Sequence, residues 1–145
     1  MKVFTIGFTK KSAEDFFNAL KRPGLKRIVD VRLNNVSQLA GFSKRDDLRF
    51  FAKTIGGLDY VHLLDLAPTQ KILDEYRKSH GSWADYESSF NSLMAERQIE
   101  SRVSKDLIEG GCLLCSEDKP RNCHRRLVAE YLQKKWGGLE IEHII

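Results

Sequence analysis

The sequence predicts an α/β fold, a single three-layer domain over residues 1–145 with a mainly parallel five-stranded sheet and helices on both faces. Two observations predict this fold. Short apolar or β-branched segments alternate along the chain with longer segments whose apolar residues recur at helical spacing. The connections between them are short, and a strand, a helix and a second strand joined in this way give parallel strands with a right-handed crossover.

The first strand is expected at residues 3–8, because VFTIGF is a short β-branched run. A helix is expected at residues 13–22, where Phe16, Phe17 and Leu20 fall at helical spacing. Ser12 precedes it, with an acid three residues later, which resembles a capping arrangement. A Pro-Gly pair closes this helix, and RIVDVR at residues 27–32 is expected to be the second strand.

Residues 33–43 carry no clear period and are expected to form a loop. Residues 44–56 place their apolar side chains on one helical face, and two glycines stop this helix. DYVHLL at residues 59–64 is the third expected strand. A largely polar helical region follows Pro68 and ends at Gly81.

The second half of the chain continues the alternation. A longer helix is expected from about residue 83 to 107, in one or two pieces, followed by the fourth strand, GCLLCS, at residues 111–116. The next helix is expected from about residue 122 to 136, with Asn122 as its N-cap. A Gly-Gly pair separates it from EIEHII, the fifth strand at residues 140–145.

Composition places the chain among globular proteins. Hydrophobic residues make up 41% and charged residues 30% of the 145 residues, which allows one hydrophobic core and argues against disorder. The apolar runs are too short for a membrane span, and Lys10 and Lys11 interrupt the first run too early for a signal peptide. We therefore expect no membrane partner, a cytoplasmic location, and three reduced cysteines rather than disulfides.

The balance of charge gives a weak indication of partners. Lys and Arg number 24 against 20 Asp and Glu, a formal net charge of +4, and no basic tail concentrates it. This favours a phosphate-bearing small molecule or a nucleic acid as partner, although the same charge also serves solubility alone. The composition does not indicate a cofactor or an oligomeric state.

The stretch LCSEDKPRNCHRR, residues 114–126, concentrates ionisable groups where the fourth strand gives way to a helix. In open α/β sheets, ligands bind at such strand ends, beside helix N-termini that offer free N–H groups. At this helix start the thiolate of Cys123 would be favoured, or Cys123 begins the apolar stripe instead. His124 can act as a general acid or base, or lie at the surface. Arg125 is expected to point into the cleft and Arg126 toward solvent.

Two sharper motifs in this stretch are disfavoured. Cys112 and Cys115 have the spacing of zinc ligands, but residues three apart on a strand point to opposite faces. The segment from Cys115 to Arg121 fits the Cys-x5-Arg loop of cysteine-dependent phosphatases. Yet Pro120 removes a backbone donor there, and the two acids repel an anion. No metal site is therefore predicted.

Asp30 and Arg32 form a second polar motif, because they lie on one face of a strand otherwise made of Ile and Val. They are expected to meet Cys115, Glu117 and the following helix start in one composite site at the strand ends. The alternative is a buried ion pair that fixes the loop after the second strand.

These motifs resemble the family known as domain of unknown function 488. The resemblance covers nearly the whole chain and rests on several short motifs. They are Thr5-Ile6-Gly7, Asp30-Val31-Arg32, Phe42-Ser43, Tyr60 with His62, LLCSE followed by Cys123-His124-Arg125, and the closing His143-Ile144. The resemblance implies an α/β domain with a polar cleft built from these motifs, and no established reaction.

The chain departs from the family's pattern at two places. Members of the family have Ile-Gly-His-Ser where this chain has Ile-Gly-Phe-Thr, so the histidine is absent and Thr9 keeps the hydroxyl. The family's Leu-Gly-Gly after the third strand is Leu-Ala-Pro here, at residues 66–68, which puts in question the close backbone approach that glycines permit.

Three functions are compatible with these observations. The first is an enzyme acting on an anionic, phosphate-bearing substrate related to nucleotides or nucleic acids, in a cleft at the carboxyl ends of the strands. The second is a non-catalytic module that binds a nucleotide or nucleic acid, and in the third the polar motifs are purely structural. For the enzyme, the expected catalytic residues are Asp30, Cys115, Glu117, Cys123 and His124, and the expected substrate-binding residues are Thr9, Arg32 and Arg125.

Overall fold

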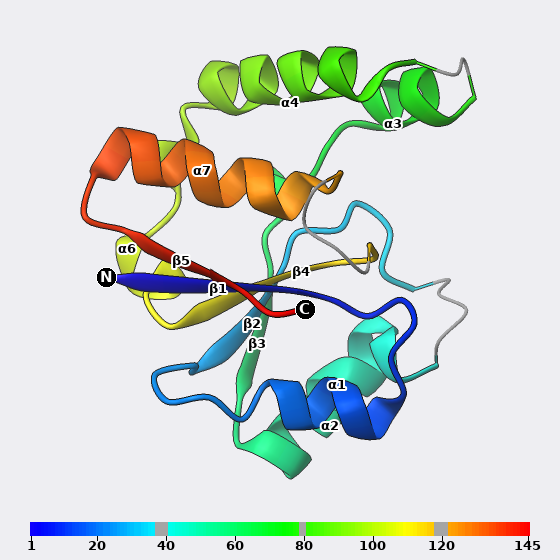
Figure 1. Ribbon diagram of the computed structural model, residues 1–145, viewed down its shortest axis with the longest axis vertical. Helices are drawn as coiled ribbons and strands as arrows, with labels where there is room; N and C mark the ends of the chain where they lie inside the picture. Colours follow the sequence, from blue (N-terminus) through cyan, green and yellow to red (C-terminus); the bar gives the residue numbers. More distant parts are fainter. Residues whose placement is uncertain (37–40, 79–80, 118–121) are drawn as a thin grey trace.

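The computed structural model describes residues 1–36, 41–78, 81–117 and 122–145, and it forms one five-stranded sheet in the order β3-β2-β4-β1-β5 (Figure 1). All neighbouring strands are parallel, so the predicted α/β fold is confirmed and the sheet is parallel throughout rather than only mainly. The strands are β1 (Lys2–Gly7), β2 (Arg27–Asp30), β3 (Asp59–His62), β4 (Gly111–Cys115) and β5 (Glu140–His143).

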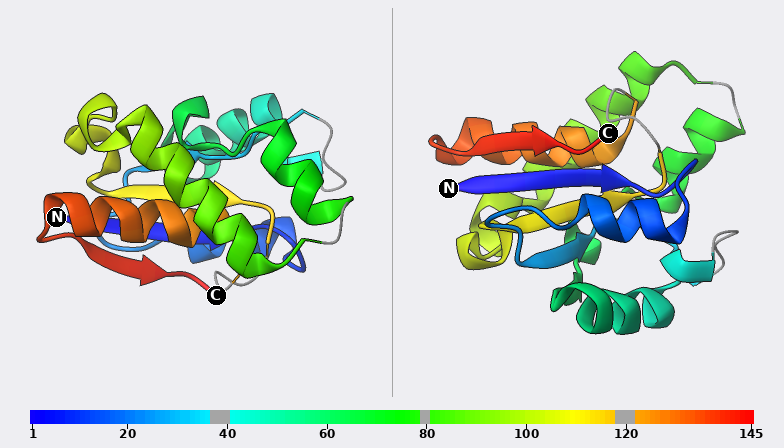
Figure 2. Two further views of the ribbon diagram at one scale, coloured as in Figure 1. Left: turned by 90° about the horizontal axis from the view of Figure 1, so that it is seen from above. Right: turned by 60° about the horizontal axis from the view of Figure 1, so that its bottom comes forward.

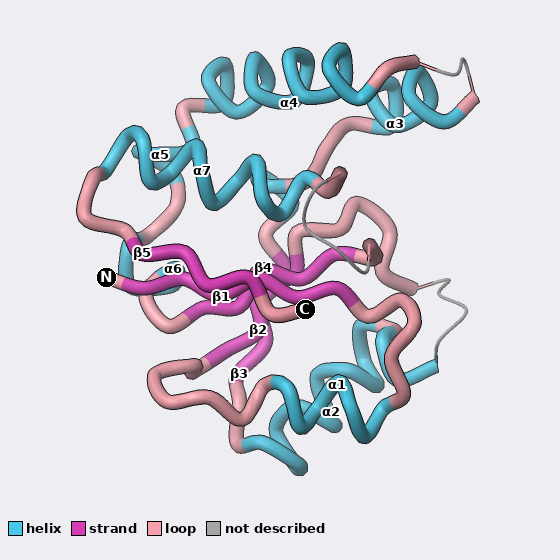
Figure 3. The backbone as a smooth tube through the Cα atoms, in the orientation of Figure 1, coloured by secondary structure: helices cyan, strands magenta, loops and turns pink. Residues whose placement is uncertain are grey.

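Helices cover both faces of the sheet, which gives the expected three layers (Figures 2 and 3). Two helices lie on one face, α1 (Ala13–Ala19) and α2 (Arg45–Gly56), and the serine expected to cap α1 does so: Ser12 Oγ accepts from the Asp15 N–H at 3.1 Å. The remaining helices are α3 (Gln70–Arg77), α4 (Trp83–Arg97), α5 (Ile99–Arg102), α6 (Lys105–Ile108) and α7 (His124–Trp136).

Several element boundaries differ from the sequence-based expectation. The long helix expected up to residue 107 is three helices, because Gln98 takes a left-handed conformation (φ 53°) at the end of α4 and Ser104 caps a new turn. Asn122 is not the N-cap of α7, since Cys123 has the extended backbone of that position (φ −140°, ψ 141°). The strands also end one or two residues earlier than expected, where their carboxyl ends give way to loops.

The alternation of side chains along the strands divides the core into two clusters, one on each face of the sheet. Cys112 belongs to the cluster under α1 and α2, whereas Cys115 belongs to the cluster under the other helices. The prediction that these two cysteines point to opposite faces is therefore confirmed. None of the helices formed by the described residues is long and apolar enough to cross a membrane.

The connections of the sheet diverge at its centre. The chain leaves β1 and β2 toward α1 and α2 on one face, and it leaves β3 and β4 toward α3 and α7 on the other (Figure 1). Because β2 and β4 are neighbours in the sheet, their carboxyl ends flank a point where the chain departs in opposite directions. Open α/β sheets bind ligands at such points.

Candidate functional site

A pocket of about 430 Å³ lies at the carboxyl ends of β2 and β4. Its floor comes from the segments that follow these strands, within residues 32–36 and 115–117, and from the start of α7 at residues 122–124. Its wall comes from α3, α4 and the segment before α3. The volume is within the range of small-molecule sites.

Asp30 and Arg32 form a buried ion pair beneath this pocket. Nε and Nη2 of Arg32 donate to the two carboxylate oxygens of Asp30, at 2.8 Å each. The Arg32 backbone N–H, Asn35 Nδ2 and the Tyr60 hydroxyl also donate to Asp30. Burial by itself would raise the pKa of Asp30, but hydrogen bonds and charge from Arg32, together with the Tyr60 hydroxyl, hold that pKa below its usual range. Both carboxylate oxygens of Asp30 therefore accept hydrogen bonds, and the residue holds Arg32, Asn35 and Tyr60 in place.

The third nitrogen of the Arg32 guanidinium is unsatisfied. Arg32 is only 3% exposed, and its Nη1 has no hydrogen-bond partner among the described residues. The guanidinium carbon lies 5.4 Å from the centre of the Phe8 ring, which covers it on one side. A buried donor without an acceptor costs about 1–3 kcal/mol. Arg32 lines the pocket, so its floor includes a cationic side chain whose buried Nη1, with two N–H groups, has no hydrogen-bond partner among the described residues.

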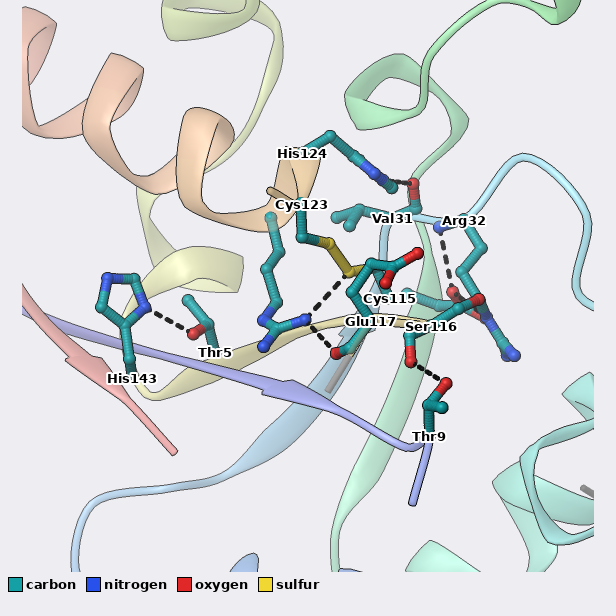
Figure 4. Close-up of a disulfide and its surroundings, with 12 residues drawn as sticks. Thr5, Thr9, Val31, Arg32, Cys115, Ser116, Glu117, Cys123, His124 and His143 are labelled. Carbon is teal, nitrogen blue, oxygen red and sulfur yellow. Dashed lines mark hydrogen bonds and ion pairs between the residues drawn. A yellow bond between two sulfur atoms is a disulfide. The ribbon is translucent and has the colours of Figure 1, made fainter. Parts of the chain in front are cut away.

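Two histidines support the end of β2, His62 from β3 and His124 from α7. His62 Nε2 is 2.7 Å from the carbonyl oxygen of Arg32, and His124 Nε2 is 2.7 Å from that of Val31 (Figure 4). Since a carbonyl only accepts, both rings carry their hydrogen on Nε2. Burial lowers the pKa of His124 to about 4, so this ring is neutral at pH 7 and its Nδ1 has an unprotonated lone pair.

Cys115 and Cys123 are joined by a disulfide at the floor of the pocket (Figure 4). The expectation of three reduced thiols is therefore wrong for these two residues, because the start of α7 lies directly above the end of β4. Cys112 remains a free thiol, and complete burial raises its pKa. The two bonded sulfurs and one ring nitrogen of His124 all lie within 4.8 Å of one another.

Arg125 and Thr9 hold the loop after β4 rather than facing the pocket. Arg125 is fully buried, and its Nη1 donates to the carbonyl oxygen of Glu117 and to Cys115 Sγ, the latter at 3.1 Å. The backbone N–H and the hydroxyl of Thr9 both donate to the carbonyl oxygen of Ser116. Gly7 permits this arrangement, because a Cβ there would lie 1.5 Å from the Glu117 carbonyl oxygen.

The wall of the pocket is aromatic, and sequence reasoning missed it. The ring centroids of Trp83 and Tyr86 are 4.9 Å apart and nearly parallel, and Tyr76 lies 5.1 Å from Tyr86. The exposed Arg77 lies beside them and also lines the pocket. The available signal was a run of aromatics and an arginine on both sides of the helix break at Gly81, which indicates an exposed aromatic cluster at a helix junction.

The structure brings five of the eight predicted site residues to the pocket and places three behind it. Those lining the pocket are Arg32, Cys115, Glu117, Cys123 and His124. Asp30, Thr9 and Arg125 instead hold the surrounding loops. For Asp30 this is the buried ion pair that we considered as the alternative to a catalytic role. Asp118, Pro120 and Arg121, on which the phosphatase-loop alternative depends, lie outside the described residues.

Comparison with known proteins identifies a family but no individual relative. A family model described as "Domain of unknown function DUF488" matches residues 12–132, which confirms the resemblance noted in the sequence. No curated protein and no solved structure matches the chain.

Proposed function

The chain belongs to the DUF488 family, whose description assigns no reaction, and we propose that it is an enzyme acting on a nucleotide or a related phosphate-bearing ligand. The ligand would bind in the pocket at the carboxyl ends of β2 and β4. The observation that carries this proposal is the unsatisfied, buried N–H of Arg32 at the floor of a pocket whose wall is aromatic. A cation facing an aromatic wall suits a ligand with an anionic and a planar end.

The phosphate end would lie against the floor. Arg32 supplies the Nη1 donor there, and Arg77 adds a second cation from α3. The start of α7 adds backbone N–H groups and the positive end of a helix dipole, because Cys123 makes no side-chain capping bond to them. Arginine is suited to phosphate, since its guanidinium can donate two hydrogen bonds at once.

The planar end would lie against the aromatic wall. The half-buried Tyr76 and Trp83 both line the pocket, and their ring centroids are 5.8 Å apart. Nucleobases stack on such side chains, with a contribution of about 1–3 kcal/mol per base. The arrangement distinguishes a nucleotide from inorganic phosphate, which would meet the arginines alone.

Glu117 is the residue best placed for proton transfer. Its side chain is exposed and lines the pocket, and among the described residues its carboxylate has no hydrogen-bond partner. Its backbone carbonyl is fixed by Arg125, so the residue is held at the pocket while its carboxylate stays available. Asp30 cannot take this role, because its oxygens are engaged by Arg32, Asn35 and Tyr60.

Replacement of Arg77 tests the phosphate end. We expect Arg77→Ala to weaken the binding of adenosine 5′-monophosphate about tenfold, close to 1.4 kcal/mol, because one charged contact to phosphate is lost. Adenosine should bind both proteins equally. Titration calorimetry with the monophosphate, adenosine and inorganic phosphate measures this.

Lys78→Ala is the matched control, because Lys78 is also an exposed cation at the end of α3 but does not line the pocket. The affinity of Lys78→Ala for the monophosphate should equal that of the wild type. Binding of the monophosphate to the wild type should weaken as the salt concentration is raised. The proposal would be contradicted if Arg77→Ala and Lys78→Ala lost the same affinity for the monophosphate, or if the wild type did not bind it.

Glu117→Gln tests the catalytic part. The variant keeps the shape of the side chain but cannot accept a proton, so turnover should fall about 10²–10⁴-fold while nucleotide binding is retained. Incubation with a panel of ribo- and deoxyribonucleotides, with products followed by mass spectrometry, measures this. Glu96→Gln, at an exposed position on α4, should keep the wild-type rate. Binding by the wild type without conversion of any nucleotide would instead identify a non-catalytic binding module.

A further inference from the structure

Three potential metal ligands meet at the floor of the pocket. Cys115 ends β4, Cys123 is the N-cap of α7 and His124 is its first residue. One ligand atom from each lies within 4.8 Å of the other two, and all three residues line the pocket. Two thiolates and an imidazole form a ligand set that suits zinc. We propose that the reduced chain binds a zinc ion through Cys115, Cys123 and His124, and this site does not depend on the nucleotide proposed above.

The backbone spacing of the two cysteines fits this proposal. Their Cα atoms are 7.4 Å apart, whereas disulfides usually join Cα atoms about 4.4–6.8 Å apart. Tetrahedral zinc with bonds of about 2.3 Å to sulfur needs its two sulfurs about 3.8 Å from each other. The Cα separation accommodates sulfurs at that distance, with the ion between them.

His124 has the hydrogen-bond pattern of a metal ligand. Its Nε2–H donates to the Val31 carbonyl oxygen, which leaves Nδ1 as the only ring nitrogen able to bind an ion. Histidines that bind metals almost always donate their other ring N–H to a carbonyl or carboxylate in this way. The ring is also held by Phe90, whose centroid lies 5.5 Å from it. The ring can therefore keep its hydrogen bond to Val31 while Nδ1 binds the ion.

The electrostatics of the site favour thiolates. Arg125 Nη1 lies 3.1 Å from Cys115 Sγ, and Cys123 lies at the positive end of α7. Both effects stabilise a deprotonated sulfur. Two thiolates cancel the charge of a divalent ion, so the nearby guanidinium meets a neutral centre rather than a second cation.

Zinc and the disulfide exclude one another. Opening the disulfide takes two electrons and two protons, which a dithiol supplies as it is oxidised to its own disulfide. Zinc then displaces the two thiol protons, which pass to solvent. Three protein ligands leave the fourth position to water, and the pocket is the side from which water can reach it. Zinc lowers the pKa of a water bound to it, and Glu117 lines the same pocket.

Cobalt substitution tests the site without any assay of activity. The full-length protein is reduced with dithiothreitol, transferred to anaerobic buffer without reductant, and titrated with Co²⁺ and then with Zn²⁺. We expect one Co²⁺ per chain, with thiolate-to-cobalt charge-transfer absorption and intense tetrahedral d–d bands that Zn²⁺ abolishes. The protein with its disulfide intact should show neither. Cys115→Ser and Cys123→Ser should lose the charge-transfer band, and His124→Gln should bind about 10–100-fold more weakly.

Cys112→Ala is the matched control, because Cys112 is a buried, free cysteine on the other face of the sheet. It should bind Co²⁺ as the wild type does. Far-ultraviolet circular dichroism checks that each variant is folded. If a serine variant is unfolded, the comparison of Co²⁺ binding by the reduced and the oxidised wild type tests the proposal instead. A folded, reduced wild type without the charge-transfer band overturns the proposal, as does a band that persists in Cys115→Ser. Nucleotide binding is measured separately, so either proposal can fail alone.

Discussion

Asp30→Asn is expected to lower the free energy of unfolding by about 3–5 kcal/mol, measured by urea denaturation at pH 7. The amide keeps one acceptor oxygen but turns an N–H₂ toward Arg32 Nη2, Asn35 Nδ2 and the Tyr60 hydroxyl, which all donate to Asp30 in the native protein. The change also leaves the guanidinium, only 3% exposed, without its counter-charge. Removing one partner of a buried pair is far more damaging than losing a surface pair.

Asp59→Asn is the matched control, since Asp59 pairs with Lys53 at 3.2 Å while both side chains remain largely exposed. Its effect should stay within about 1 kcal/mol. The difference in free energy of unfolding between the wild type and Asp30→Asn should also become smaller at acidic pH. The pKa of Asp30 is lower in the folded protein than in the unfolded chain, where it is near 3.8. The carboxylate therefore contributes fully to the free energy of unfolding above the unfolded pKa, and this contribution is lost as the pH falls through the folded pKa. If Asp30→Asn and Asp59→Asn lost the same free energy of unfolding at pH 7, the buried pair would contribute no more to stability than the exposed one.

Gly7→Ala is expected to destabilise the protein by at least about 3 kcal/mol, although it adds a single methyl group to a buried strand end. The new Cβ would lie 1.5 Å from the Glu117 carbonyl oxygen and 2.9 Å from Arg125 Nη1. Neither the strand nor the carbonyl can move alone, because Arg125 and Thr9 both hold the loop after β4. Thermal and urea unfolding measure the loss.

Gly41→Ala provides the comparison, because a Cβ at Gly41 meets no atom within 4 Å among the residues that the structure describes, and Gly41 is not among the described glycines with a positive φ. This variant should be within about 0.5 kcal/mol of the wild type. If Gly7→Ala proved equally mild, the close approach of the Glu117 carbonyl to β1 would not be a determinant of the fold. Retained stability with altered nucleotide affinity would show that the loop had moved instead.

The architecture could be predicted because its signals are local. Short apolar or β-branched runs identified the strands, and apolar residues at helical spacing identified the helices. Turn and capping residues such as Ser12 and Gly57 set the ends of helices. The prediction allowed for two helical pieces between residues 83 and 107 but did not locate the break at Gln98, since a left-handed glutamine has no distinctive sequence signal. Met94 before the break and Ile99 after it both belong to one buried core cluster, whose members are distant in the sequence.

The sequence predicted where the site lies but not which side chains line the pocket. Asp30 and Arg32 stood out because two charges interrupt an apolar strand, and period two predicted their common face. The predicted direction of Arg125, into the cleft, was wrong, because its side chain is buried in the space left by Gly7, in a strand more than a hundred residues away. The aromatic wall was missed for a similar reason, since rings on α3 and α4 look like core residues until the helices are placed over the strand ends.

The position of β4 has a consequence for how the polypeptide acquires its structure during synthesis. β4 pairs with both β1 and β2, which do not pair with each other, yet it is made only after β1, β2 and β3. A nascent chain that ends before Gly111 has β1 and β2 but lacks the strand that joins them. The backbone N–H and C=O groups along the edges of β1 and β2 that pair with β4 therefore lack these partners until the ribosome has released β4.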